Sequence, residues 1–159
     1  MPRLDPQEMA IIARAAEAPM REQTIDWALI NSGSRNLPGL AAMASRLAEA
    51  FAVLPGNIEL VEGAPVDAVA ADGTRTALEQ GRHLVVRVRP DAPLRMLFTG
   101  HMDTVFPADH PFQTVTDMGG DRFGGPGVAD MKGGIAVMLA ALRALEHADD
   151  AGRFGYDVL

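Results

Sequence analysis

The run Leu94–Gly100, which His101 and Asp103 follow, constrains the fold of this chain more than any other segment. Most of its side chains are apolar, and Pro93 and Gly100 bound it, which is the pattern of a short strand. In open α/β folds, residues just past such a strand lie at the carboxyl edge of the sheet, where ligands bind. The pattern therefore predicts an α/β fold with His101 and Asp103 at this edge.

His101 and Asp103 have the residue types and spacing of a metal ligand and its orienting partner. Neutral imidazole is the commonest nitrogen ligand for zinc. Residues two apart in extended backbone point to the same side, so the Asp103 carboxylate can accept the proton on the other ring nitrogen of His101. That contact would fix the tautomer and orientation of the ring. A lone His-x-Asp is also common in proteins without any metal site, so this pair needs support from elsewhere in the chain.

Asp130 supplies a second carboxylate, between the Gly/Pro-rich loop Gly124–Gly127 and the apolar stretch Ile135–Leu145, which predicts a buried helix. An Asp there can cap the helix, whose dipole favours its anionic form. Its two oxygens can instead bridge two cations about 3.5–4 Å apart. Gly133 and Gly134 lower helix propensity by about 1 kcal/mol each relative to Ala, which indicates a close backbone approach or tight helix–sheet packing.

The segments Leu97–Pro107 and Gly125–Gly134 resemble two N-terminal signatures of a zinc-dependent exopeptidase family, almost residue for residue. That family includes carboxypeptidase G, aminoacylase, acetylornithine deacetylase and succinyl-diaminopimelate desuccinylase. Asn31–Asn36 and the helix after it resemble the start of carboxypeptidase G-like (glutamate carboxypeptidase) members. The resemblance implies that His101 is a ligand of one metal ion, that Asp130 bridges two, and that Asp103 orients His101 and is catalytic. It also implies a cis peptide bond after Asp130.

The resemblance implies a helix–sheet–helix catalytic domain with a mixed, mostly parallel sheet, of which residues 1–159 are the incomplete N-terminal part. Arg153–Leu159 resembles the strand that leads into the family's Glu-Glu pair, whose first Glu is the general base and whose second is a metal ligand. We expect that pair, two later ligands and an inserted dimerisation domain to lie outside the sequence. The sheet should then expose an apolar edge.

The expected function is hydrolysis of amide bonds in N-acyl amino acids or small peptides that carry a free carboxylate. The complete protein would be a homodimer, and residues 1–159 alone would be nearly inactive. The alternative is a non-catalytic metal-binding or interaction module from a truncated gene, which a stop codon after Leu159 would favour.

Composition limits the cofactor and the partners. The chain has no cysteine, so a metal must be held by oxygen and imidazole, which suits zinc and also cobalt or manganese. A net charge of -7 disfavours nucleic acid and anionic membrane as partners. The segment Met1–Glu8 lacks the apolar core of a signal peptide, and no apolar stretch is long enough to cross a bilayer, so we expect a cytoplasmic protein.

Hydrophobic periodicity predicts the remaining elements. The expected helices are Gln7–Ala18, Met20–Ile30, Leu37–Val53 and Met131–His147; the last should be buried nearly all round. The apolar face of the helix Leu37–Val53 should consist of Leu40, Met43, Ala44, Leu47 and Phe51. Strands are expected at Asn57–Glu62 and His83–Arg89, the latter paired with Leu94–Thr99, and a turn at Asp72–Gly73.

The other polar residues have simpler interpretations. Ser32 and Ser34 look like turn residues at a helix end, and His83 like a structural residue at the start of a strand. His110 should shape its loop, His147 should be solvated, and Met131 and Met138 should fill the core.

Overall fold

The helices of this protein lie where hydrophobic periodicity predicts them. The structure, a computed structural model, describes residues 4–159. Within them the α-helices are α1 (Pro6–Ala16), α2 (Met20–Ala28), α3 (Leu37–Phe51) and α4 (Gly133–Leu145). A capping box opens α1, in which the backbone N–H groups of Asp5 and Glu8 each donate to the other's carboxylate at 2.8 Å.

The sequence leads us to expect neither a membrane-spanning helix nor a signal peptide. Among residues 4–159, no helix combines the length and the apolar character that a membrane span needs. The expectation about a signal peptide includes residues 1–3, which lie outside the described residues.

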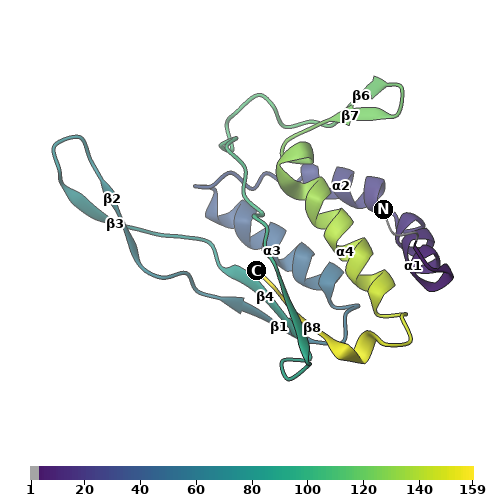
Figure 1. The fold of residues 1–159 in the computed structure, drawn as a ribbon. Helices are drawn as coiled ribbons and strands as arrows, with labels where there is room; N and C mark the ends of the chain where they lie inside the picture. The colour runs from purple at the N-terminus through teal and green to yellow at the C-terminus, as the bar shows by residue number, and fades with distance from the viewer. Residues whose placement is uncertain (1–3) are drawn as a thin grey trace.

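A mixed four-stranded sheet forms the other layer, in the order β1 (Asn57–Val61), β4 (His83–Val88), β8 (Phe154–Val158) and β5 (Leu94–Phe98). Two hairpins stand apart from it (Figure 1): β2 (Val66–Val69) with β3 (Arg75–Leu78), and β6 (Thr116–Gly119) with β7 (Arg122–Gly124). The expected turn joins β2 to β3, where Gly73 has a φ of 85°. The α/β class and the mixed sheet are therefore confirmed.

The strand pairing differs from expectation at one point. In the described sheet, β8 lies between β4 and β5, antiparallel to β4 and parallel to β5, so the predicted β4–β5 pair is wrong. The pair β1–β4 is also antiparallel, so the expectation of a mostly parallel sheet is wrong for the described strands.

Burial explains why β8 is central. Tyr156 and Val158 of β8 are only 0% and 5% exposed, which agrees with a strand that has a neighbour on each side and packs its face against the core. The loop after β4 crosses the start of β8, where Nε of Arg89 donates to the carbonyl of Phe154 at 2.6 Å.

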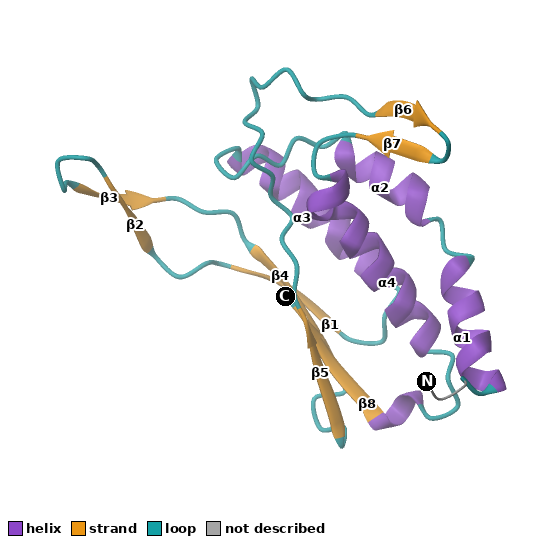
Figure 2. Cartoon of the chain, turned by 45° about the horizontal axis from the view of Figure 1, so that its top comes forward, coloured by secondary structure: helices purple, strands orange, loops and turns teal. Residues whose placement is uncertain are grey.

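The helices gather on one face of the sheet (Figure 2), and the core lies between the two layers. All five predicted apolar residues of α3 are buried. They meet the inward residues of β4, which alternate as expected: Leu84, Val86 and Val88. Helix α4 is buried along most of its surface, but Val137 is 57% exposed, so the prediction of burial all round is wrong there.

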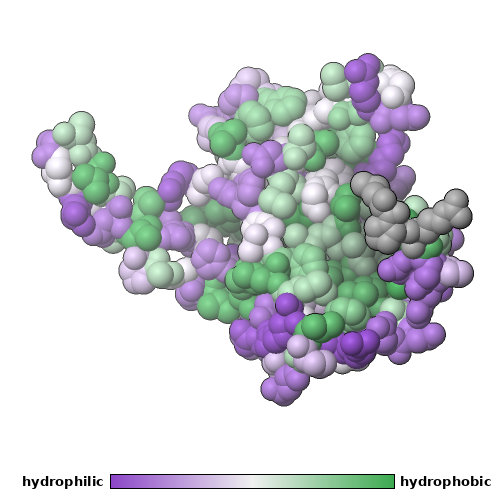
Figure 3. All heavy atoms as spheres, viewed as in Figure 1, coloured by the Kyte–Doolittle hydropathy of each residue, from purple (hydrophilic) through white to green (hydrophobic). Residues whose placement is uncertain are grey.

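β5 forms an edge of the sheet and leaves apolar side chains accessible. Leu94, Met96 and Leu97 are 46%, 37% and 61% exposed. Hydrophobic residues accordingly gather on this face of the molecule (Figure 3). The expected apolar edge is thus present.

Candidate metal centre

His101 lies at the carboxyl edge of the sheet, as its position after a strand predicts. The ladder between β5 and β8 continues past Phe98: Leu159 N donates to Phe98 O and Gly100 N donates to Leu159 O, both at 2.9 Å. This pairing places His101 at the end of the sheet, where its side chain is 45% exposed.

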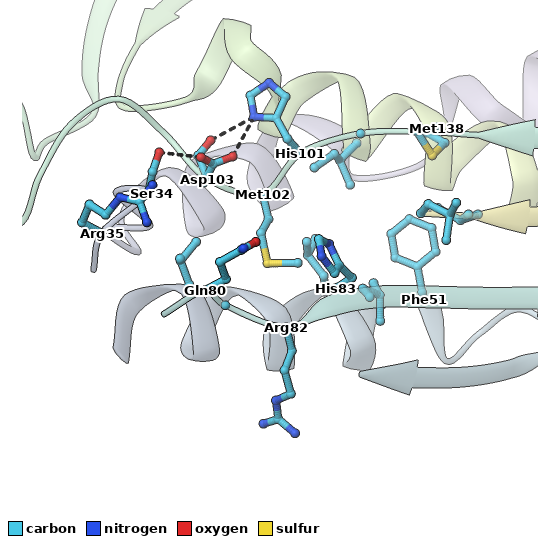
Figure 4. Close-up of a pocket in the computed structure, with 18 of the residues that line it drawn as sticks. Ser34, Arg35, Phe51, Gln80, Arg82, His83, His101, Met102, Asp103 and Met138 are labelled. Carbon is cyan, nitrogen blue, oxygen red and sulfur yellow. Dashed lines mark hydrogen bonds and ion pairs between the residues drawn. The ribbon is translucent and has the colours of Figure 1, made fainter. Parts of the chain in front are cut away.

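The structure brings His101, Asp103 and Asp130 together. Nε2 of His101 lies 3.0 Å from Oδ1 of Asp130. Nδ1 lies 3.1 Å from the backbone carbonyl of Asp103 and 3.3 Å from its carboxylate oxygen Oδ1 (Figure 4). Asp103 therefore contacts the second ring nitrogen as expected, but through its backbone as well as its side chain. With the proton on Nδ1, the Nε2 lone pair is free for a metal ion.

The charge of His101 depends on the same contacts. Burial favours the neutral ring, but the hydrogen bond to Asp130, the contact with the backbone of Asp103 and the two negative charges outweigh it. The pKa of His101 is therefore raised above its ordinary value of 6.5. A metal ion between His101 and Asp130 would replace this proton.

Asp130 does not cap α4, contrary to one of the two expectations for it. The residues Val128–Lys132 form an irregular turn, in which Asp130 has a φ of -136°, and α4 begins only at Gly133. The peptide bond after Asp130 is cis, as the family resemblance implies. The Asp130 side chain is 85% exposed and turned toward His101, so both oxygens are accessible to ligands.

Gly133 is required by a close backbone approach, whereas Gly134 is not. A Cβ at Gly133 would lie 2.7 Å from the carbonyl oxygen of Val128. A Cβ at Gly134 would meet only the Met131 side chain, at an ordinary 3.5 Å. The predicted close approach is thus confirmed at the first of the two glycines.

Lys132 fixes this turn from inside, which the sequence did not indicate. Its side chain is 0% exposed, and Nζ donates to the carbonyls of Trp27 and Ile30 at the end of α2, both at 2.9 Å. Burial lowers the pKa of Lys132 to about 8. The turn that contains Asp130 is thereby tied, two residues further on, to a helix about 100 residues earlier in the chain.

The connector between α2 and α3 holds the segment that carries His101. Gly33 forms a β-bridge with Thr104, Ser32 Oγ donates to Met102 O at 2.7 Å, and Ser34 Oγ donates to Oδ2 of Asp103 (Figure 4). The interpretation as turn residues is thus confirmed for Ser34, which lies in a turn after α2, whereas Ser32 lies just before that turn, and both side chains also bond the segment that carries His101. Ser34 restrains the carboxylate that faces His101.

The simpler interpretations of the other residues hold. His110 shapes its loop, since its Nδ1 accepts the backbone N–H of Phe112 at 3.0 Å. His147 is exposed, and Met131 and Met138 pack against the core. His83 opens β4 and lines a cavity of about 440 Å³ on one side of His101 (Figure 4).

The donors fit part of a metal site. Imidazole and carboxylate are ligands that zinc prefers, and the two donor atoms face each other. Residues 4–159, however, contain no group of three or more potential ligands from His, Cys, Asp and Glu. Zinc sites normally have three or four protein ligands. The described residues can therefore hold one side of a metal centre.

Comparison with known proteins identifies the relationship. Residues 97–154, which include both segments described above, match the family model described as Peptidase family M20/M25/M40. A succinyl-diaminopimelate desuccinylase of Gluconobacter oxydans (strain 621H) is 48% identical over 57 residues, which are 33% of this chain and 14% of that protein. The coarse relationship to M20 peptidases is thus supported on the segment that carries His101 and Asp130.

Solved structures extend the similarity in fold to nearly the whole chain. Human carnosine dipeptidase 1 matches with a TM-score of 0.66 and 20% identity, over 99% of this chain and 35% of that one. The dipeptidase Dug1p from Saccharomyces cerevisiae matches with a TM-score of 0.69 and 14% identity, over 94% and 34%. The chain thus spans about a third of the length of these structures.

Proposed function

We propose that residues 1–159 form the N-terminal part of the catalytic domain of a two-metal, carboxypeptidase G-like hydrolase. The observation that carries the proposal is the 3.0 Å approach of His101 Nε2 to Asp130 Oδ1 at the carboxyl edge of the sheet. The match of the same segment to the M20 peptidases supports amide-bond hydrolysis as the reaction.

The proposed roles follow from the contacts. His101 would hold one metal ion through Nε2, and the exposed carboxylate of Asp130 would be a ligand of the metal pair. Asp103, restrained by Ser34, holds the proton of His101 on Nδ1 and so keeps the ring in the tautomer that can bind a metal. When bound, a zinc pair supplies Lewis acidity, which polarises the scissile carbonyl and activates water near neutral pH. Cobalt or manganese suits the same donors.

We propose N-acyl amino acids or small peptides with a free carboxylate as substrates. The general base and the remaining ligands would come from parts of the domain outside residues 1–159, and the complete protein would be a homodimer. Loss of a general base alone reduces rate by about 10²–10⁴. A polypeptide restricted to these residues should therefore be nearly inactive.

Zinc binding and hydrolysis test the proposal together. In the natural gene product, His101→Ala and Asp130→Asn should each abolish zinc-dependent hydrolysis of N-acyl amino acids and lower the zinc content measured by mass spectrometry. His147→Ala is the matched control, because His147 is exposed near the end of α4. Full zinc content and activity in both site variants would refute the proposed roles.

A further inference from the structure

A second cavity is also lined by His101, and most of its lining is apolar. It has a volume of about 290 Å³, and its lining includes His101 and Asp130 together with Val105, Phe106 and Phe112. We call these last three residues the apolar wall. Pockets for whole small ligands measure about 300–1,000 Å³, so this cavity suits one group of a ligand.

The apolar wall is accessible although its side chains are hydrophobic. Val105 is 83% exposed and Phe112 is 39% exposed. Single exposed apolar residues are common, but these lie together in one cavity next to the proposed metal ligands. A substrate group that enters the cavity would remove this surface from water.

The aromatic part of the wall is packed into one unit. The rings of Phe106 and Phe112 meet edge to face, with centroids 5.0 Å apart. His110 supports them from behind: its ring lies 5.0 Å from that of Phe106, and its Nδ1 accepts the N–H of Phe112. The rings are thus held in place without a ligand.

Asn31 fixes the loop that carries the wall. Its Nδ2 donates to Phe106 O at 3.2 Å and to Gln113 Oε1 at 2.9 Å. Gln113 in turn donates to His110 O at 2.7 Å. A loop restrained from both of its ends presents a preorganised surface, which lowers the entropic cost of binding.

We propose that the apolar wall binds a bulky aromatic or branched apolar group next to the scissile amide of the substrate. The inference rests on the proposed function, since the amide must lie at His101 and Asp130. In this cavity Phe106, Phe112 and the proposed ligands His101 and Asp130 share one space. The preferred substrates are therefore apolar N-acyl amino acids or dipeptides, with the group on either the acyl side or the amino-acid side.

Two substrate series applied to the zinc-loaded natural gene product test this specificity. One series changes the acyl group from acetyl to benzoyl on a fixed amino acid. The other changes the side chain from alanine to phenylalanine under a fixed acetyl group. The wild type should prefer the aromatic member in one of the two series, which identifies the side of the amide that the wall contacts.

Variants of the wall should remove that preference. We expect Phe112→Ala to lower the ratio of kcat/KM values, aromatic over small, by about tenfold or more, because pocket contacts of this size discriminate about 10–200-fold. Val105→Asp should do the same by placing a charge in the cavity, and it does not threaten folding because Val105 is exposed. Phe123→Ala is the matched control: Phe123 lies on β7, outside this cavity, against Arg21.

The outcomes separate the two proposals. Hydrolysis without an aromatic preference in either series, or with a preference that both wall variants retain, overturns the specificity inference and leaves the proposed function intact. A zinc-loaded wild type that hydrolyses no member of either series overturns the proposed function, and the specificity inference with it.

Discussion

Replacing Lys132 by Met should destabilise the protein, because the Lys132 side chain is buried and bonds two backbone carbonyls. The ammonium of Lys132 is fully buried and donates to the carbonyls of Trp27 and Ile30 at 2.9 Å. Methionine has a similar length and is apolar, so it fills the same space but leaves both carbonyls without this donor.

The size of the effect follows from two opposing contributions. A buried acceptor left unsatisfied costs about 1–3 kcal/mol. This cost applies to the carbonyl of Ile30, because the carbonyl of Trp27 still accepts the backbone N–H of Ile30 at 3.1 Å. Burial of the ammonium works in the other direction, as the lowered pKa of Lys132 shows, and this cost disappears in the variant. We therefore expect the free energy of unfolding to fall by about 1–3 kcal/mol. For a domain of this size, that corresponds to a decrease in Tm of about 2–12 °C.

Thermal and urea unfolding followed by circular dichroism measure this change, with Arg143→Met as the control. Arg143 is an exposed cation in the last turn of α4, so its replacement should change stability by no more than about 0.5 kcal/mol. A Lys132→Met protein whose Tm lies within about 2 °C of the wild type would show that the two hydrogen bonds do not hold the turn.

Three further perturbations probe the site and the core. Gly33→Ala places a Cβ against the carbonyl oxygen of Phe106, and calorimetry should show a loss of about 1–3 kcal/mol in stability. Ser34→Ala removes the donor to Asp103 and should weaken zinc binding in a calorimetric titration by about 10–100-fold; unchanged affinity would contradict the proposed restraint. For Glu146, burial raises the pKa, but its ion pair and its tyrosine hydrogen bond outweigh this and lower the pKa below 4.5. Because the pKa of Glu146 is lower in the folded than in the unfolded state, the ionised carboxylate stabilises the protein above pH 4.5. This stabilisation is lost as the pH falls through the folded pKa. Glu146→Gln should therefore make Tm depend less on pH below pH 4.5.

Local sequence patterns are sufficient to predict those helices and strands whose apolar residues recur at one regular spacing. The five apolar positions of α3 and the alternating residues of β4 are all buried as their spacing predicts, because one helix face or one strand face meets the core. Pairing between strands does not follow from such patterns. The short loop after β4 favours a β4–β5 hairpin, yet β8 lies between these two strands, where its Tyr156 and Val158 are buried.

The candidate site likewise contains features that the sequence predicts and features that it does not. His101, Asp103 and Asp130 were predictable because their residue types carry chemistry and each follows or precedes a recognisable element. Their assignment as ligands and orienting residue stays a prediction. The absence of a helix cap at Asp130 was not predictable, since a turn such as Val128–Lys132 departs from helical φ and ψ in a way that hydrophobic spacing does not indicate.

The contacts that hold the site in place are long-range, and they explain why Ser34 and Lys132 escaped notice. Ser34 and Asp103 are 69 positions apart in the sequence, and Lys132 lies 105 positions from Trp27. Both contacts converge on the end of α2 and the connector after it, so this short stretch restrains His101's partner on one side and the turn of Asp130 on the other. A change in the connector should therefore move both proposed ligands at once, whereas a change in α1 should move neither.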